Sequence, residues 1–365
     1  MTLNKIGFIG LGLIGGSIAK AVRQYYPDCE ITAFDKSKET LALALQENVI
    51  TASCSTIDDS FRGCDFVFLC TPVSYNNAYL KQICRYLDEN TLLTDVGSVK
   101  TSIHEEVKAL GLDRQFIGGH PMAGSEKSGY SNSKAFLIEN AYYVITPSDT
   151  VPEERIQTFQ ELILSLRAIP IRLNYRQHDQ ITGMISHLPH IIASGLVNFV
   201  KEQDDSNQLM KMLAAGGFKD ITRIASSSPT MWEHICLLNQ EYISEILSEY
   251  IASLEKIKAL VDTSDADRLH SFFAEAREYR NSMPEISAGP IKKSFSIYCD
   301  LIDEAGGIAA IATILSASGI SIKNIGILHN REFEDGVLHI EFYDEAASDH
   351  AAALLEKYHY IIYRR

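Results

Sequence analysis

The hydrophobic pattern in the first half of the chain alternates between two kinds of segment. Short apolar runs, typical of buried strands, occupy residues 5–9, 30–34, 65–70, 91–96, 142–145 and 169–173. Amphipathic stretches with helical spacing, such as 17–26 and 38–46, lie between them. This alternation is typical of βαβ units, so residues 1–174 are predicted to form one α/β domain around a doubly wound, mostly parallel sheet.

The next region, residues 175–287, has almost no strand pattern and is predicted to be all-helical. Its longest periodic stretch, 229–261, has apolar residues three or four positions apart, among them Trp232, Ile235 and Tyr242. We therefore predict one continuous helix there, with an apolar stripe along one side. A single small domain cannot cover so long a stripe. The pattern favours an all-α dimerisation domain whose stripe packs against a second copy of the chain.

The last region, residues 294–365, follows a predicted linker at 284–290. Its pattern alternates again, with strands expected at 295–301, 320–328, 336–343 and 360–363 and helices at 308–317 and 351–357. The order βαββαβ over so short a length predicts a ferredoxin-like α+β domain.

Composition and charge exclude several classes of protein. The net charge of -14 disfavours nucleic acid and anionic membranes as partners. The seven cysteines are scattered and form no CxxC pair, which argues for reduced thiols and against a disulfide framework. No apolar run approaches the ~20 residues of a membrane span. We expect a soluble, cytoplasmic protein.

A glycine-rich loop follows the first predicted strand. Gly10 would permit a tight turn, Gly12 would let backbone approach a pyrophosphate, and Gly15 would let the helix pack closely on the strand. Asp35 follows Gly15 by 20 residues and would accept hydrogen bonds from ribose hydroxyls while repelling a 2′-phosphate. This spacing predicts a Rossmann domain that binds NAD; the alternative is a glycine-rich turn in a domain without a nucleotide. We assign four further residues to the same cofactor site: Leu13, Ile14, Thr71 and Pro72.

Polar residues cluster after two later segments. Residues 95–100 (DVGSVK) follow a predicted strand, where open α/β sheets place their ligands. Residues 118–129 (GGHPMAGSEKSG) are expected to lie between structured elements, and His120 is their only group able to act as a base near neutral pH. A structural or merely exposed histidine is the alternative. The four glycines around it imply close approach of backbone to another group, which favours a functional role.

Two further histidines and one arginine are candidates for binding an anionic substrate. His187 and His190 lie in the segment SHLPH, whose spacing lacks the glutamate of HExxH, so we predict no metal site. Packing at the start of a helix is the other alternative. Arg223 follows the glycine pair at 216–217 and could equally be a solvated surface charge.

The order of these segments resembles one family. The series GLGLIGGS, DVGSVK, GGHPMAGSEKSG, SHLPH and GGFKDITRIA, from about residue 4 to about 285, is similar to the prephenate dehydrogenases of tyrosine biosynthesis. The last region resembles an ACT domain at 303–308 and 320–325, although Ala305 stands where that family usually has proline. The resemblance implies NAD-dependent oxidative decarboxylation of prephenate to 4-hydroxyphenylpyruvate, with feedback regulation by tyrosine.

The resemblance also implies roles for single residues. His120 would hydrogen-bond the ring hydroxyl of the substrate, and Ser98 would help to orient that hydroxyl and His120. Arg223 would hold a substrate carboxylate. The other residues expected beside the substrate are His187, His190, Gly216 and, at the mouth of the pocket, Glu126. Tyrosine would bind the last domain near Gly306 and Asn324.

Three alternatives remain open from the sequence. An arogenate dehydrogenase would share the whole scaffold. A β-hydroxyacid dehydrogenase would also pair a Rossmann domain with helices, but its catalytic lysine is not evident here. A non-catalytic regulator that binds a nucleotide or an amino acid would produce no NADH.

Overall fold

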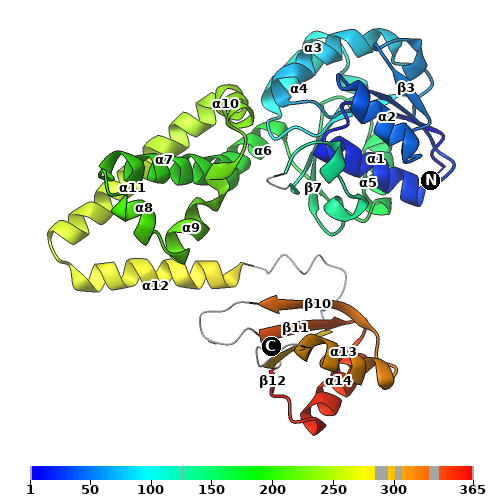
Figure 1. Cartoon of the computed structure of the whole chain (residues 1–365). Coiled ribbons are helices and arrows are strands. Elements are labelled where there is room, and N and C mark those ends of the chain that lie inside the picture. Colours follow the sequence, from blue (N-terminus) through cyan, green and yellow to red (C-terminus); the bar gives the residue numbers. More distant parts are fainter. Residues whose placement is uncertain (1, 125–126, 284–294, 301–305, 329–336, 364–365) are drawn as a thin grey trace. The chain divides into compact units, whose positions relative to one another are not determined.

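The computed structural model describes residues 2–124, 127–283, 295–300, 306–328 and 337–363. The chain divides into two compact units, Met1–Arg280 and Asn281–Arg365 (Figure 1). The predicted linker at 284–290 and Glu126 lie outside the described residues.

A five-stranded parallel sheet forms the centre of the first unit, with strand order β3-β2-β1-β4-β5. Its strands are β1 (Lys5–Ile9), β2 (Glu30–Phe34), β3 (Ala52–Cys54), β4 (Phe66–Leu69) and β5 (Leu92–Asp95). The helices between and after them are α1 (Leu13–Tyr25), α2 (Lys38–Gln46), η1 (Asp59–Phe61), α3 (Val73–Ile83), η2 (Cys84–Tyr86), α4 (Thr101–Ala109) and η3 (Asp113–Gln115). The predicted βαβ alternation and parallel sheet are confirmed, and β3, which is three residues long, was not predicted.

A second, three-stranded sheet continues from β5 through a bridge between Leu93 and Phe116. It contains β6 (Ile117–Pro121), β7 (Tyr142–Pro147) and β8 (Ile169–Arg172), with η4 (Tyr130–Asn132), η5 (Ala135–Ile138) and α5 (Glu153–Ser165) between them. The β6–β7 pair is antiparallel and the β7–β8 pair is parallel.

The expectation that 118–129 lies wholly between structured elements is wrong, because its start forms β6. Glycine has low strand propensity, which concealed this strand in the sequence. A Cβ at Gly118 would lie 2.4 Å from Thr146 Oγ1, and one at Gly119 would lie 2.6 Å from the Asp95 carbonyl oxygen. Both glycines therefore let β6 approach its neighbouring strands closely.

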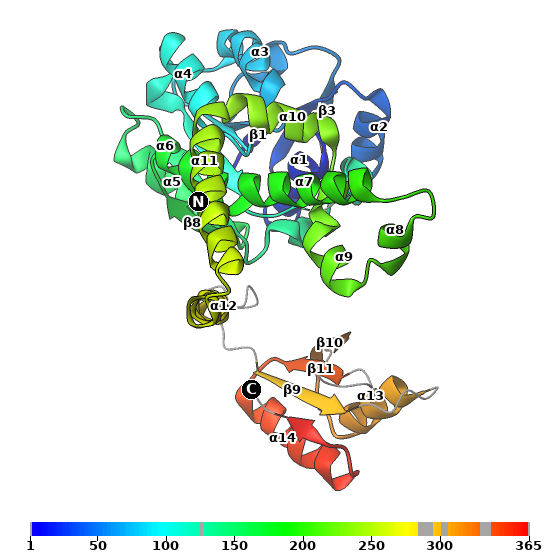
Figure 2. The same ribbon diagram turned by 90° about the vertical axis from the view of Figure 1, so that its left-hand side faces the viewer.

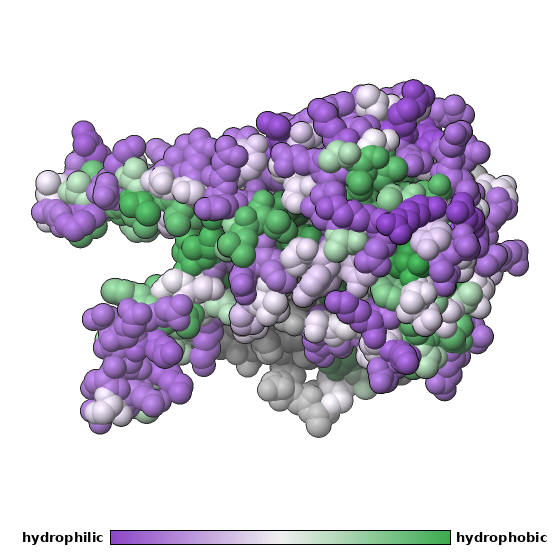
Figure 3. Space-filling view, turned by 90° about the horizontal axis from the view of Figure 1, so that it is seen from above, coloured by the Kyte–Doolittle hydropathy of each residue, from purple (hydrophilic) through white to green (hydrophobic). Residues whose placement is uncertain are grey.

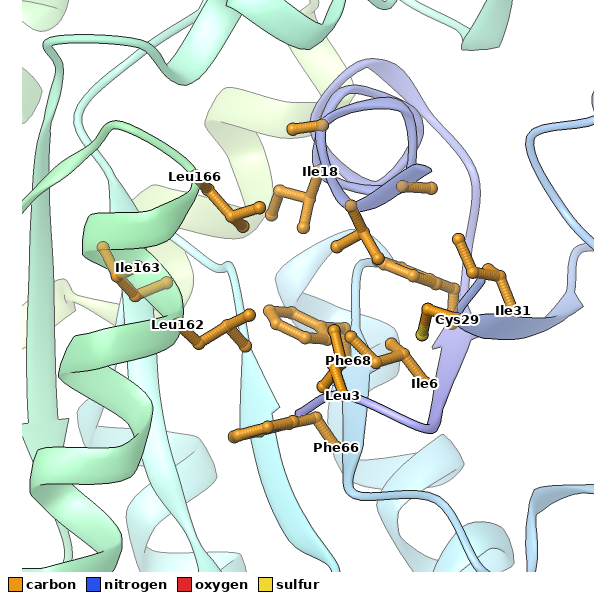
Figure 4. Packing of buried hydrophobic residues seen from close by; sticks show 14 of the residues in the cluster. Leu3, Ile6, Ile18, Cys29, Ile31, Phe66, Phe68, Leu162, Ile163 and Leu166 are labelled. Carbon is orange, nitrogen blue, oxygen red and sulfur yellow. The ribbon is translucent and has the colours of Figure 1, made fainter. Parts of the chain in front are cut away.

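Both faces of the parallel sheet are buried, which explains its continuous apolar strands. In β4, Phe66 and Phe68 point toward the core beneath α1 and α5, whereas Val67 and Leu69 point toward the core beneath α3 and α4. Figure 4 shows Phe66 and Phe68 packed with side chains such as Ile18 and Leu162. Asp95, at the carboxyl end of β5, belongs to neither of these two apolar cores.

The rest of the first unit is helical, as predicted. Its elements are α6 (Tyr175–Thr182), the π-helical turn η6 (Gly183–His187), α7 (Leu188–Gln203), α8 (Leu209–Leu213), α9 (Gly216–Thr222), η7 (Arg223–Ser226), α10 (Pro229–Leu238), α11 (Gln240–Asp262) and α12 (Ala266–Ser282). Figures 1 and 2 show α11 crossing α7, which it contacts. Among the described residues, one continuous helical run, Tyr175–Gln203, is long and apolar enough to cross a membrane by length and composition alone. In its most apolar stretch of 18 residues, 17% is buried inside the protein.

The prediction of one continuous helix over 229–261 is wrong. The helix breaks at Asn239, whose backbone angles of φ -112° and ψ 28° are not helical. The side chain of Asn239 is buried and donates a hydrogen bond to the Asp179 carbonyl oxygen at 2.9 Å. The apolar spacing continues across the break, so the pattern alone could not reveal it.

The second unit contains β9 (Phe295–Asp300), α13 (Gly307–Ala317), β10 (Ile322–Leu328), β11 (Val337–Phe342), α14 (Glu345–Lys357) and β12 (Ile362–Tyr363). The predicted order of elements is confirmed. All pairings in its sheet are antiparallel, with strand order β10-β11-β9-β12. Ile297, Leu315 and Leu355 share its buried core. Helix α14 begins six residues earlier than expected, where Asp344 accepts a hydrogen bond from the Ala347 amide.

Candidate active site

A cavity of about 630 Å³ lies at the carboxyl ends of the strands, where the sheets meet η6 and α10. Eight residues assigned from the sequence line it: Gly12, Leu13, Ile14, Thr71, Pro72, Ser98, His120 and His187. Six others are not among its described lining residues: Gly10, Gly15, Asp35, His190, Gly216 and Arg223. The cavity therefore joins part of the predicted cofactor loop to the predicted reacting group.

The glycine loop has a geometry that suits a dinucleotide. Gly10 has φ +96°, and a Cβ at Gly15 would lie 2.4 Å from the Gly10 carbonyl oxygen, so the turn and the helix are closely packed. A Cβ at Gly12 would meet nothing within 4 Å, and α1 begins there without a side-chain cap. Amide groups at the start of α1 are therefore open to an anion.

Asp35 is fixed beside this loop. One carboxylate oxygen accepts the Leu11 amide at 2.7 Å, and the other accepts the Ser37 amide at 2.8 Å. An ionised carboxylate offers about four lone-pair positions, so acceptor capacity remains for ribose hydroxyls. The loop and Asp35 together fit the ribose and phosphates of a dinucleotide without a 2′-phosphate.

His120 lies on β6 and faces the cavity. Its Nδ1 is 2.8 Å from Nε2 of His178 on α6, and Nδ1 of His178 is 2.8 Å from Oδ1 of Asp179. Burial, followed by the neighbouring His178 and Lys100, holds the pKa of His120 well below its usual value. His120 is therefore neutral near pH 7 and can accept a proton.

A buried ion pair supports this part of the site. The Lys100 ammonium pairs with Asp95, and both side chains are fully buried. Asp95 Oδ1 also accepts the Gly119 amide at 3.3 Å, while Oδ2 accepts the Gly97 amide at 2.9 Å. Burial lowers the pKa of Lys100, although Asp95 opposes that shift. The pair connects the loop that carries Ser98 to the strand that carries His120.

The opposite wall comes from the helical part. The π-helical turn η6 places His187 at the cavity, and π-helical turns are frequent at functional sites. Nδ1 of His187 is 3.0 Å from Nδ2 of Asn239, an amide donor, so the neutral ring carries its proton on Nε2. Burial lowers the pKa of His187 to about 4.

Two buried donors on this wall have no hydrogen-bond partner in the described part of the chain. They are Nε2 of His187 and Nε1 of Trp232. Trp232 lines the cavity, and its ring stacks on His190 with centroids 3.7 Å apart. The ring of Trp232 also contacts His187 edge-on, with centroids 6.0 Å apart, so both histidines of SHLPH pack against Trp232. Unsatisfied buried donors are rare in folded proteins, which makes these two nitrogens unusual features of this wall.

Arg223 and Gly216 lie further along the helical part. Arg223 begins η7 and is exposed, and Gly216 begins α9. The structure therefore brings His120, Ser98 and His187 together in one chain but does not place these two residues at the cavity.

Sequence reasoning missed His178, Asp179 and Asn239. His178 and Asp179 lie in the polar stretch YRQHDQIT, and Asn239 interrupts an apolar pattern. Nothing in either pattern distinguishes a buried hydrogen-bonded residue from a solvated one.

Comparisons with known proteins cover almost the whole chain. Family models described as "Prephenate dehydrogenase, nucleotide-binding domain" and "Prephenate dehydrogenase, dimerization domain" match residues 18–171 and 175–275. Prephenate dehydrogenase of Bacillus subtilis (strain 168) is 37% identical over 95% of this chain and 94% of its own. Prephenate dehydrogenase of Lactococcus lactis subsp. cremoris (strain MG1363) is 36% identical over 97% of this chain and 98% of its own.

A solved structure agrees with these relatives. The crystal structure of prephenate dehydrogenase from A. aeolicus, in complex with hydroxyphenyl propionate and NAD+, is similar with a TM-score of 0.74 and 30% identity. The likeness covers 78% of this chain and 99% of that chain. The fold and the site thus define a dehydrogenase whose nucleotide-binding and helical domains share one cavity. The chain belongs to the prephenate dehydrogenase family.

Proposed function

We infer that this chain is an NAD-dependent oxidoreductase that converts prephenate to 4-hydroxyphenylpyruvate and CO2. Family membership over nearly the full length supports the substrate. The observation that carries the chemistry is that one cavity is lined both by the dinucleotide loop at Gly12 and by the neutral base His120. A β-hydroxyacid dehydrogenase is disfavoured, because the family assignment covers both domains.

His120 is the proton acceptor in this proposal. Prephenate carries a ring carbinol and, across the ring, a carbon that bears a carboxylate. When bound, NAD+ accepts the hydride from the carbinol carbon. His120 takes the hydroxyl proton, and Ser98, on the same cavity, orients the hydroxyl. Loss of CO2 then sends an electron pair into the ring, which becomes aromatic, and His120 returns the proton to the phenolic oxygen.

The helical wall binds the substrate carboxylates in this proposal. The orphaned Nε2–H of His187 and Nε1–H of Trp232 supply neutral donors at the cavity. Arg223, Gly216, His190 and Glu126 are proposed as further substrate contacts on the strength of the resemblance. Arg223 would supply a bidentate clamp for a carboxylate. Since Arg223 is not a lining residue of this single chain, its contact requires a movement of η7 or the presence of a second copy.

A homodimer explains the exposed apolar surface of the helical domain. Ile185, Phe199 and Leu237 are 63%, 61% and 64% exposed in the single chain. Figure 3 shows hydrophobic side chains reaching the surface over the helical part of the first unit. The matching family model is described as a dimerization domain, so a second copy is the partner that covers this surface. The proposed location of the dimer is the cytoplasm, where the seven free thiols remain reduced.

The second unit is proposed to be a ferredoxin-like ACT domain that senses tyrosine. Its βαββαβ order and its antiparallel strand order β10-β11-β9-β12 support the fold. Gly306 precedes α13 with φ +99°, and Asn324 lies exposed on the edge strand β10. Both positions offer backbone groups to an amino-acid effector. Coupling between such a domain and the catalytic domains is typically ~1–3 kcal/mol.

Production of NADH from prephenate tests the function, with and without tyrosine. The full chain should reduce NAD+ with prephenate, use NADP+ poorly, and slow down when tyrosine is added. A chain ending near residue 283 should keep the activity and lose the response to tyrosine. No NADH with prephenate would refute the enzyme assignment. Equal inhibition of both chains would place tyrosine in the active site instead.

A further inference from the structure

A chain of hydrogen bonds runs from the cavity into the helical domain through two side chains that the reaction scheme does not use. It passes from His120 on β6 to His178 and then to Asp179, both on α6. His178 and Asp179 are fully buried. Any role of these two residues in the reaction rests on the proposed function, in which His120 is the proton acceptor.

Asp179 is held as an ionised acceptor at the end of this series of hydrogen bonds. Its two oxygens accept the backbone amides of Lys100 and Thr101 at 2.8 and 2.7 Å, where α4 begins without a side-chain cap of its own. Burial alone would raise the pKa of Asp179, but hydrogen bonds from His178 and Thr101 outweigh it and bring the pKa below its usual value. A carboxylate in this state can only accept hydrogen bonds.

The proton positions on both histidines are set by that acceptor. Nδ1 of His178 must donate to Asp179, and burial lowers the pKa of His178, so this ring is neutral and its Nε2 carries a lone pair. Nδ1 of His120, 2.8 Å from that lone pair, must then be the donor. The lone pair of neutral His120 is left on Nε2, the ring nitrogen directed away from His178.

We propose that His178 and Asp179 are positioning residues for the reaction, which hold His120 in the tautomer whose Nε2 can accept the substrate's hydroxyl proton. The opposite tautomer would present an N–H to the hydroxyl and could not act as the base. In serine proteases an aspartate fixes the tautomer of the catalytic histidine directly. Here a second histidine, His178, lies between Asp179 and His120.

The same series of hydrogen bonds from His120 to Asp179 disperses the charge that forms during the reaction. When the hydroxyl O–H bond breaks and the proton joins Nε2 of His120, this ring becomes an imidazolium. Its Nδ1 proton can pass to Nε2 of His178, which moves the positive charge one ring closer to the Asp179 carboxylate. The reverse transfers return the proton to the product oxygen, so the three residues neither gain nor lose a proton over a turnover.

A pair of substitutions at His178 tests the proposal. His178→Leu removes the acceptor for Nδ1 of His120, whereas the carbonyl of His178→Gln can still accept that N–H. We expect His178→Leu to lower kcat roughly 10²-fold or more, since the wrong tautomer costs ~10⁴ in the comparable case. KM for prephenate and Kd for NAD+ should change less than about threefold. His178→Gln should keep at least about ten times the kcat of His178→Leu.

Combination with His120→Asn separates positioning from a structural role. If His178 acts through His120, His178→Leu should cost almost nothing more in the His120→Asn background, because residues that act as a unit are not additive. A full second loss in that background, or equal kcat for the Leu and Gln variants, would overturn the proposal. If His178→Leu does not fold, the kcat of His178→Gln is compared with that of the wild type, once with His120 intact and once with His120→Asn. The same criterion then applies: a loss that disappears in the His120→Asn background supports positioning. Near-normal turnover by His120→Asn alone would instead refute the proposed role of His120.

Discussion

The cavity wall that β5 and β6 support (the sheet wall) and the wall that η6 and α10 provide (the helical wall) differ in how their nitrogen-bearing side chains are connected. On the sheet wall, Asp95 pairs with Lys100, and His120 is hydrogen-bonded to His178. On the helical wall, buried nitrogens of His187 and Trp232 have no partner in the described residues. The bonds to His120 indicate that the reacting side is preorganised within the fold, and the proposed function assigns the helical wall to substrate binding. Substitutions on the two walls should therefore change different kinetic constants.

The largest effect is expected on the sheet wall at His120. His120→Asn removes the proton acceptor, so kcat should fall roughly 10²–10⁴-fold while KM for prephenate changes little. Steady-state NADH production measures both constants. His270→Asn, an exposed substitution on α12, is the matched control and should keep wild-type kcat. If His120→Asn instead raised KM for prephenate at normal kcat, the sheet wall would be shown to bind the substrate rather than to accept its proton.

The buried ion pair should affect stability more than any exposed pair. Lys100→Met leaves the Asp95 carboxylate buried without its partner, so we expect the free energy of unfolding to fall by ~3–5 kcal/mol. Urea unfolding followed by circular dichroism measures the loss. Lys81→Met removes the ammonium from the partly exposed pair with Glu106 and should cost less than ~1 kcal/mol. Equal losses for the two variants would show that the sheet wall does not depend on this pair.

The smallest effect should come from the helical domain and should appear in binding. Arg223→Ala removes a charged hydrogen bond to a carboxylate, so KM for prephenate should rise by the equivalent of ~1.5–3 kcal/mol at nearly constant kcat. Arg223→Lys keeps the charge without the bidentate geometry, so its KM should lie between those of the wild type and Arg223→Ala. Initial rates at a series of prephenate concentrations give the three KM values. An unchanged KM in Arg223→Ala would place this residue outside the bound-state pocket, as it is in the single chain.

The sequence patterns predicted most of the fold because hydrophobic spacing dominates its elements. The limits of β1, β2 and α2 match the expected segments, and the order of elements in the second unit was predicted in full. The failures have local causes. The glycines of β6 conceal a strand, because the close approach that they permit depends on neighbouring strands far away in sequence. The break at Asn239 depends on bonds to α6 and η6, which no periodicity reports.

The site shows the same division. His120 and Ser98 stood out in glycine-rich loops after strands, and both line the cavity. His178 and Asp179 could not be distinguished from solvated residues, because their burial comes from packing between α6, β6 and the start of α4. Arg223 stood out as a cation beside glycines, but its distance from the cavity depends on how the helical domain folds.

The tautomer of His120 tests the proposed preorganisation of the sheet wall most directly. Nitrogen-15 chemical shifts of the ring, assigned by their loss in His120→Asn, distinguish a protonated from a lone-pair nitrogen. Burial, with His178, Lys100 and His187 facing the ring, lowers its pKa, so the ring should remain neutral at pH 6.5, where a free histidine is about half protonated. We predict Nδ1–H with a lone pair on Nε2. A proton on Nε2, or an imidazolium at pH 6.5, would contradict the proposed role of His120.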